Sequence, residues 1–262
     1  MIELKSRRQL EILDAANRII RTILGELSEM IAPGVTTADL NRHAEGRLEE
    51  EGAGAAFKGY RLPGYSPFPA ALCTSVNEEV VHGIPSPDRV LRAGDIVSLD
   101  FGGVVDGLYG DAAVTVPVGR VADEAVDLIT TAREALWRGI EQARPGRRVS
   151  DISAAVQQRV ESSGYAVVRD FVGHGIGRQM HEEPQVPNYV ASGIRDPELR
   201  AGMVLAIEPM IAAGGWEVEV DRDNGWTVRT RDRSLSAHWE LSVAVTEAGP
   251  WVLGGPPGEG TG

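Results

Sequence analysis

The chain has 262 residues, 42% of them hydrophobic, which is enough for one large domain or two fused halves. Its 38 acidic and 26 basic residues give a net charge of -12, which argues against nucleic acid or an anionic membrane as the main partner. A single cysteine excludes an internal disulfide, and no apolar run approaches the ~18 residues of a membrane span or forms a signal core near the N-terminus. We expect a cytoplasmic protein.

Two helices are predicted at the start of the chain. Ser6 is a candidate N-cap for a long helix that ends before Pro33-Gly34, because apolar residues recur at steps of three and four. A second helix is predicted to begin near Thr37. Residues 57–72 then mix aromatic residues with prolines and predict an ordered, non-helical loop. Aromatics in such a loop usually cap a core, and the alternative is one wall of an apolar pocket.

Two acidic strands carry the same entry sequence. Leu91-Arg-Ala-Gly opens an alternating strand that reaches Asp100, and Leu199-Arg-Ala-Gly opens one that reaches Glu208, 108 residues later. A His-Gly-Ile segment precedes each strand, and a second acidic strand follows each, opened by Asp111 or Glu240. This pattern indicates an internal duplication, with halves at about 6–120 and 121–250.

The second half repeats the order of elements. Apolar spacing predicts helices at about 123–142 and 150–162, and the stretch between Gly215 and Ser236 predicts a hairpin and loop. The glycine- and proline-rich residues 254–262 are expected to form a disordered tail after a single catalytic domain at 1–253. The expected fold class is α+β, with a curved antiparallel sheet covered on its outer face by four helices.

The four acids are expected to hold metal. A strand places Asp100, Asp111, Glu208 and Glu240 beside same-face neighbours that are mostly apolar or small, where a solvated face would carry charges. Four carboxylates that share such a face repel one another and are costly to bury without cations. They suit two divalent ions, with manganese, iron or cobalt favoured over a structural zinc site. Such a site hydrolyses amides or phosphoesters, and the absence of a basic cluster favours amides.

The histidines are less clearly assigned by pattern. His174 lies among glycines that allow close approach, and His181 follows seven residues later, so the chain must bend for both to reach one site. His43 and His238 are each interpreted as an ordinary satisfied histidine, with reservations for His238.

The sequence resembles the type I methionine aminopeptidases of the pita-bread fold, from the first helix to about Val252. The resemblance lies in seven segments, which are Ser75-Val-Asn-Glu-Glu-Val-Val-His-Gly-Ile-Pro85, Ser98-Leu-Asp-Phe-Gly102, Gly110-Asp-Ala-Ala-Val-Thr115, Gly173-His-Gly-Ile-Gly177, Met180-His-Glu-Glu-Pro184, Ile207-Glu-Pro-Met210 and Trp239-Glu240.

The resemblance implies a role for each site residue. Asp111 and Glu240 would bridge two cations (Mn, Fe(II) or Co, with Zn as an alternative), Asp100 would complete one of them, and His174 and Glu208 would complete the other. The implied catalytic residues are His82 and His181, which contact substrate, and Glu208, which takes the proton of the attacking water.

The resemblance also implies the substrate, the N-terminal methionine of peptides and nascent proteins with a small second residue. The implied pocket for the methionine side chain consists of Tyr65, Phe68, Cys73, Met180 and Trp226. Three residues depart from the family pattern: Met180 replaces a common aromatic, and His238 and Leu241 flank Glu240 where Gln and His are frequent.

Three other functions stay open at this stage. They are an Xaa-Pro aminopeptidase or prolidase of the same fold, a non-catalytic binding scaffold, and a dimetal phosphoesterase. A monomer is expected from the resemblance, ribosome association is left open, and neither nucleic acid nor membrane is an expected partner.

Overall fold

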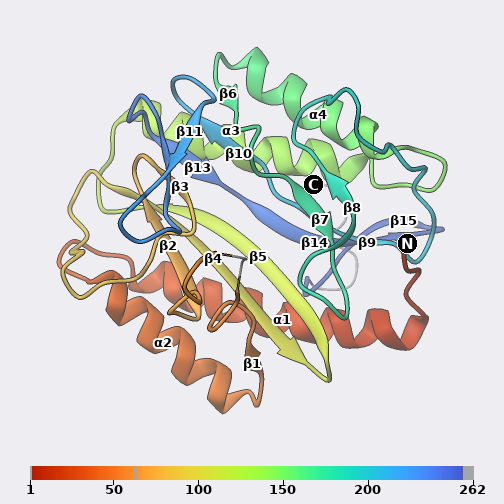
Figure 1. Ribbon diagram of the computed structural model, residues 1–262, viewed down its shortest axis with the longest axis horizontal. Coiled ribbons are helices and arrows are strands. Elements are labelled where there is room, and N and C mark those ends of the chain that lie inside the picture. Colours follow the sequence, from red (N-terminus) through yellow and green to blue (C-terminus); the bar gives the residue numbers. More distant parts are fainter. Residues whose placement is uncertain (1, 62–63, 256–262) are drawn as a thin grey trace.

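The computed structural model describes residues 2–61 and 64–255. Figure 1 shows one curled sheet whose outer face is covered by two pairs of helices, one pair over each half. The helices are α1 (Arg7–Met30), α2 (Thr37–Glu50), α3 (Asp123–Glu141) and α4 (Val149–Ser162). The strands are β1 (Gly54–Ala55), β2 (Leu72–Val76), β3 (Glu79–Val81), β4 (Ile96–Val105), β5 (Leu108–Pro117), β6 (Ala166–Val167), β7 (Gly173–Gly175), β8 (Glu182–Val186), β9 (Val204–Ile207), β10 (Met210–Ala212), β11 (Val218–Val220), β12 (Val228–Thr230), β13 (Ser236–His238), β14 (Glu240–Thr246) and β15 (Gly249–Val252).

Side-chain caps fix where the first two helices begin. The hydroxyl of Ser6 accepts a hydrogen bond from the backbone of Gln9, and Thr36 caps α2 through Asp39 in the same way. The predicted start of α1 at Ser6 is therefore confirmed. All four helices lie within a few residues of their predicted positions.

Within the described residues, nine strands form the main sheet, and all of their pairings are antiparallel. The path runs β1-β4-β5-β14-β9-β7-β8, with β2 paired to β4 and β15 paired to β14. The long β4–β5 hairpin lies in the middle and turns at Asp106-Gly107, where both residues have a positive φ. That conformation matches the twist of the two strands, and Asp-Gly is suited to it.

The helices cover one face of the sheet. Leu99 and Phe101 of β4 are buried in a cluster with residues of α1 and α2. Leu205 and Ile207 of β9 are buried in a second cluster with residues of α3 and α4. Because successive strand residues alternate sides, Asp100, between Leu99 and Phe101, points to the opposite, inner face. The predicted architecture of a curved sheet under four helices is confirmed.

Three other regions bear on the expectations. The predicted hairpin after Gly215 is present as β11 and β12, which pair from Val218–Thr230 to Val220–Val228. Residues 256–262 of the expected disordered tail lie outside the described residues, while the backbone N–H of Gly254 donates to Asp14 of α1. In the described part of the chain, no helix combines the length and apolar character that crossing a membrane requires.

Candidate metal centre and substrate cavity

The strand register brings three acids together across the middle of the sheet. Asp100 of β4 lies opposite Ala113 of β5, and Ala113 lies opposite Glu240 of β14. These residues therefore form one row. Asp111 lies two residues along β5 from Ala113, so it projects from the same face in the next row. Ala113 leaves room between the carboxylates of Asp100 and Glu240.

The far side of the sheet supplies a fourth acid and an imidazole. β9 lies between β14 and β7, and Ala206 of β9 pairs with His174 of β7. Glu208 is the first residue after β9, so it emerges at the strand end rather than within a strand as its pattern predicted. The Nε2 atom of His174 lies 3.5 Å from a carboxylate oxygen of Glu208.

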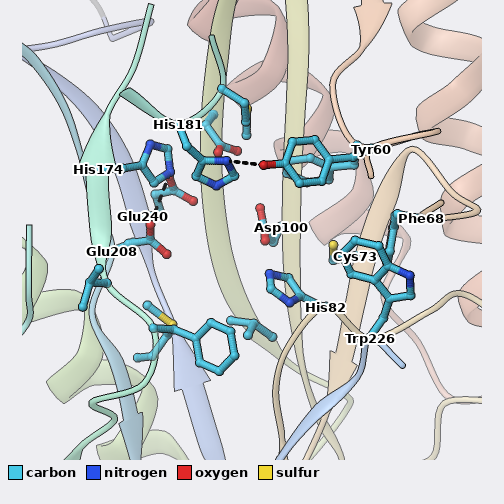
Figure 2. A pocket seen from close by; sticks show the side chains of 17 residues that line it. Tyr60, Phe68, Cys73, His82, Asp100, His174, His181, Glu208, Trp226 and Glu240 are labelled. Carbon is cyan, nitrogen blue, oxygen red and sulfur yellow. Dashed lines mark hydrogen bonds and ion pairs between the residues drawn. The ribbon is translucent and has the colours of Figure 1, made fainter. Parts of the chain in front are cut away.

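The four acids open onto one cavity of about 320 Å³. Figure 2 shows His174, His181, Glu208 and Glu240 on one side, Asp100 near the centre, and Phe68, Cys73 and Trp226 on the other. The residues that line the cavity are Phe57, Tyr60, Phe68, Cys73, Val81, His82, Asp100, Asp111, Phe171, Val172, His174, Met180, His181, Glu208, Met210, Trp226 and Glu240.

The buried acids have the properties of a cation site. Within the described residues, one carboxylate oxygen of each of Asp100, Asp111 and Glu240 is buried without a hydrogen-bond partner. Ligand atoms of Asp111, His174 and Glu240 all lie within 4.8 Å of one another, as do those of Glu208, His238 and Glu240. Unpartnered buried carboxylate oxygens are costly, and divalent cations satisfy them. The donor set therefore fits the expected divalent ions.

Electrostatics in the cation-free chain support this fit. Burial, together with the nearby charge of Glu208, raises the pKa of Asp100 to about 7. Burial raises the pKa of Glu208 to about 8. Burial and the neighbouring carboxylates also raise the pKa values of Asp111 and Glu240 well above their usual range. Positive charge at this place would reverse these shifts, because it favours the ionised carboxylates.

His174 is held in the form that a ligand requires. Its Nδ1 lies 2.9 Å from the carbonyl oxygen of Gly175. An Nδ1–H that donates to this carbonyl leaves the Nε2 lone pair free, facing Glu208. Burial lowers the pKa of His174 to about 3, so the ring is neutral. A neutral imidazole with one nitrogen anchored is the usual state of a metal-ligating histidine.

His181 reaches the cavity through the predicted bend. The chain turns back between β7 and β8, which pair antiparallel, and the ring centroids of His174 and His181 lie 4.4 Å apart. The phenol oxygen of Tyr60 lies 2.9 Å from Nδ1 of His181. The buried Lys5 side chain holds the carboxylate of Glu182, the next residue, at 2.6 Å. The turn that carries His181 is thus fixed from two sides.

His82 lies near Cys73 and Trp226, across the cavity from His174 (Figure 2). Its ring meets Phe171 and Trp226 edge-on, with centroids 5.5 and 6.1 Å away. Burial is the main cause that lowers its pKa to about 4, so this ring is also neutral. The duplication made His82 and His174 equivalent by pattern. In the structure, the ring of His174 lies close enough to the acids to share a cation with them, and the ring of His82 does not.

Four of the five expected pocket residues line the apolar part of the cavity: Phe68, Cys73, Met180 and Trp226. The indole N–H of Trp226 donates to the carbonyl of Ser66 at 2.8 Å, which fixes the ring. Burial raises the pKa of the Cys73 thiol well above its usual range, so this wall is uncharged.

Tyr65, the fifth expected pocket residue, lies outside the cavity lining in this structure. Its side chain is 47% exposed and contacts Trp226 at a centroid distance of 6.1 Å, and Tyr65 is not part of the cavity lining. Tyr65 lies in an irregular loop, where no strand or helix period fixes the direction of a side chain. Its neighbour in the same loop, Tyr60, points inward instead.

Some cavity residues were not singled out by pattern. Phe57 and Tyr60 lie in the predicted aromatic loop, so the signal was present but did not distinguish them from Tyr65. Phe171 precedes the glycine-rich segment of His174. His238 was interpreted as an ordinary buried histidine, yet it groups with Glu208 and Glu240. The only signal for it was its place two residues before Glu240.

A curled antiparallel sheet with four outer helices, and an inner cavity lined by carboxylates and histidines, defines the pita-bread class of metallopeptidases. The model of the Metallopeptidase family M24 matches residues 11–247. The chain belongs to this family.

Similar proteins extend over nearly the whole chain. A methionine aminopeptidase of Clostridium acetobutylicum is 49% identical over 253 residues, which is 97% of this chain and 98% of the relative. One of Aquifex aeolicus is 46% identical over 255 residues, covering 96% and 98% of the two chains. The crystal structure of methionine aminopeptidase from Thermotoga maritima matches with a TM-score of 0.91 at 44% identity, covering 97% of this chain and 99% of that one.

More distant structures share the fold. The Xaa-Pro dipeptidase of Bacillus anthracis matches with a TM-score of 0.74 at 22% identity. This chain covers 63% of that protein, and the likeness shows the fold alone.

Proposed function

We propose that the protein is a metal-dependent aminopeptidase that removes the N-terminal methionine from peptides and nascent proteins whose second residue is small. The observation that carries the proposal is the two-sided cavity. One wall offers carboxylates and neutral imidazoles for cations, and the other offers an uncharged pocket of Phe68, Cys73 and Trp226. The relatives at 46–49% identity over nearly full length carry the name methionine aminopeptidase.

Five residues hold the cations in this proposal. Asp100, Asp111, His174, Glu208 and Glu240 would hold a pair of divalent ions, with Asp111 and Glu240 shared between the two ions, Asp100 serving one of them and His174 and Glu208 serving the other. Mn, Fe(II) or Co suits the oxygen-rich donors, and Zn is an alternative. When bound, such a pair supplies a Lewis acid for the carbonyl and lowers the pKa of a water molecule.

The remaining groups of the chain act on the peptide. Glu208 accepts the proton of the attacking water and returns it to the leaving amine. His181 donates from Nε2 to the oxygen of the scissile carbonyl, where negative charge develops. Tyr60 supports this role by donating to Nδ1 of His181, since that hydrogen bond places the ring proton on Nε2. His82 contacts the substrate from the opposite wall.

The apolar wall explains the choice of residue. A methionine side chain is unbranched and adapts to an irregular pocket, and its sulfur contacts aromatic rings favourably. Phe68 and Trp226 supply two such rings, which meet edge-to-face at 5.3 Å. A free amino group would coordinate a cation or hydrogen-bond to the acids, and an internal residue has no such group, which favours the first peptide bond over internal ones.

We also propose that residues 1–253 act as one catalytic domain with two related halves. The cavity takes Asp100 and Asp111 from the first half and His174, Glu208 and Glu240 from the second, so neither half alone carries the complete set. A cytoplasmic monomer agrees with the single free cysteine and with the substrate, an N-terminus newly made by the ribosome.

The competing function is cleavage before proline, the activity named for the more distant structures. Rates on Met-Ala-Ser, N-acetyl-Met-Ala-Ser and an Ala-Pro dipeptide, each with added Mn²⁺ and with chelator, distinguish the two. The proposal expects metal-dependent turnover of Met-Ala-Ser alone, since acetylation removes the amine. Faster turnover of Ala-Pro would overturn the substrate assignment, and metal-independent turnover would overturn the mechanism.

A further inference from the structure

His238 is a buried histidine whose ring has no hydrogen-bond partner among the described residues. The residue is 1% exposed, and neither Nδ1 nor Nε2 is bonded. A buried, unsatisfied polar group is destabilising, so such a ring requires an explanation.

The backbone around His238 is fixed. Its N–H donates to the hydroxyl oxygen of Thr115 at 2.9 Å, and its carbonyl accepts from the same hydroxyl at 2.8 Å. His238 also pairs with Met210 across β13 and β10. These contacts hold the ring on the side of the acids, and they leave it little freedom to find a partner elsewhere.

The ring faces two acids of the metal centre. Its Nε2 lies 3.5 Å from Oε2 of Glu208. Ligand atoms of Glu208, His238 and Glu240 all lie within 4.8 Å of one another, and Oε1 of Glu240 is also buried without a partner. The unbonded ring of His238, the unbonded Oε1 of Glu240 and the carboxylate of Glu208 therefore face one small volume.

We propose that His238 is a nitrogen ligand to a divalent cation that it shares with Glu208 and Glu240. This inference deepens the proposed function and rests on it, because it adds a donor to the same centre. The ligand set implied by resemblance has one imidazole, His174. With His238 the chain offers two, one in each of the trios that meet at Glu240.

The spacing fits coordination better than a direct hydrogen bond. An N–H···O bond has a usual length of about 2.7–3.2 Å, and the atoms of His238 and Glu208 are farther apart. Two ligands at about 2.0–2.1 Å from a tetrahedral ion are separated by roughly 3.3 Å. A cation placed between the two side chains satisfies both of them with little movement.

A second imidazole changes which cation the centre prefers. Oxygen donors suit Mn²⁺, whereas imidazole suits Zn²⁺, Cu²⁺, iron and nickel. Affinity for a given set of ligands also rises from Mn²⁺ to Co²⁺, so His238 should strengthen binding of Co²⁺ and Zn²⁺ more than binding of Mn²⁺. Replacing His238 should therefore weaken binding of Co²⁺ and Zn²⁺ selectively.

The first test compares His238→Gln with His43→Gln in chelator-stripped protein. His43 is a matched control, because its Nε2 already bonds Glu26 on the outer helices at 2.8 Å. In calorimetric titrations, His238→Gln should lower the affinity for Co²⁺ and Zn²⁺ at least about 10-fold and the affinity for Mn²⁺ much less. The visible spectrum of the Co²⁺ form should also change. His43→Gln should match the unsubstituted chain. Unchanged affinities and spectrum in His238→Gln would overturn the inference.

The second test uses the unsubstituted chain and does not depend on how the variant folds. Crystals grown with excess Co²⁺ should show an anomalous peak at about 2.0–2.2 Å from Nε2 of His238. Cobalt bound to Asp111, His174 and Glu240 with no peak within about 3 Å of His238 would overturn the inference and leave the proposed function standing. Failure of the chain to bind any divalent cation would overturn both.

Discussion

The phenol of Tyr60 and the imidazole of His181 are joined at 2.9 Å, although 121 residues separate them in the sequence. Tyr60 belongs to the aromatic loop before β2, and His181 belongs to the turn between β7 and β8. The dashed line between Tyr60 and His181 in Figure 2 marks this contact, which joins two residues of the cavity lining. A hydrogen bond to Nδ1 determines which nitrogen of His181 presents a proton to the substrate.

Tyr60→Phe should lower kcat about 10-fold with little change in KM, because the loss of one orienting hydrogen bond costs about 1.4 kcal/mol in the transition state. The ring packing is retained in this variant. Tyr165→Phe is the control, since Tyr165 bonds Asp127 on the outer helix α3. Steady-state kinetics on Met-Ala-Ser checks this prediction. Equal kcat values for Tyr60→Phe and Tyr165→Phe would contradict it.

Asp111→Asn and His181→Ala should both abolish turnover, but for different reasons. The Asp111 carboxylate is buried with one unpartnered oxygen, and an amide is a weaker, uncharged donor, so the first variant should lose bound cation. His181→Ala should keep its cations. Metal analysis of both proteins after dialysis tests the distinction, and a fully loaded Asp111→Asn would refute the bridging role.

The stability of the cation-free protein should fall as the pH rises. Asp100 and Glu208 have folded-state pKa values of about 7 and about 8, against about 4 in the unfolded chain. Their contribution to stability is therefore present below about pH 4 and is lost as the pH rises to about 8. Cations should reverse this loss, because they bind the ionised carboxylates.

Thermal unfolding at pH 5.5 and 8.5 measures this effect. We expect the Tm of chelator-stripped protein to be about 4–8 °C lower at the higher pH, and Mn²⁺ to raise the Tm more there. Asp100→Asn is the matched control and should show a shallower decline, since its amide does not titrate. A higher Tm of the stripped protein at pH 8.5 than at pH 5.5 would contradict the prediction.

Cys73→Leu should raise KM for methionine substrates about 10-fold and leave the cation content unchanged. Cys73 is 3% exposed and packs with Phe68 and Trp226, so a larger side chain must occupy space that the substrate needs. Cys73→Ala keeps that space and should remain close to the unsubstituted chain. Kinetics on Met-Ala-Ser for both variants tests the prediction, and an unchanged KM in Cys73→Leu would place the substrate side chain elsewhere.

Much of the fold follows from local signals in the sequence. Ser6 and Thr36 cap α1 and α2 by bonding the backbone three residues later. Apolar spacing locates α3 and α4. The acids were predictable as a group, because Asp100 and Glu208 follow identical strand entries in a repeated order. Their meeting on one face follows from strand alternation once the sheet is antiparallel.

Tyr60, Tyr65 and His238, whose directions were not predicted by spacing, lack such a periodic signal. Tyr60 and Tyr65 lie in one irregular loop, and only the tertiary contacts of that loop direct one inward and the other outward. His238 lies on a short strand, and the contact with Glu208 depends on the pairing of β13 with β10. Both cases depend on contacts between distant segments, which sequence spacing does not encode.

In the proposed function, this chain removes N-terminal methionine with the help of divalent cations. The most direct measurement is the initial rate on Met-Ala-Ser and Met-Leu-Ser, using chelator-stripped protein before and after addition of Mn²⁺, Co²⁺ or Fe²⁺. We predict no turnover before addition and, after it, cleavage of Met-Ala-Ser at a much higher rate than Met-Leu-Ser. Failure of every cation to restore cleavage, or equal rates on the two peptides, would contradict the proposed function.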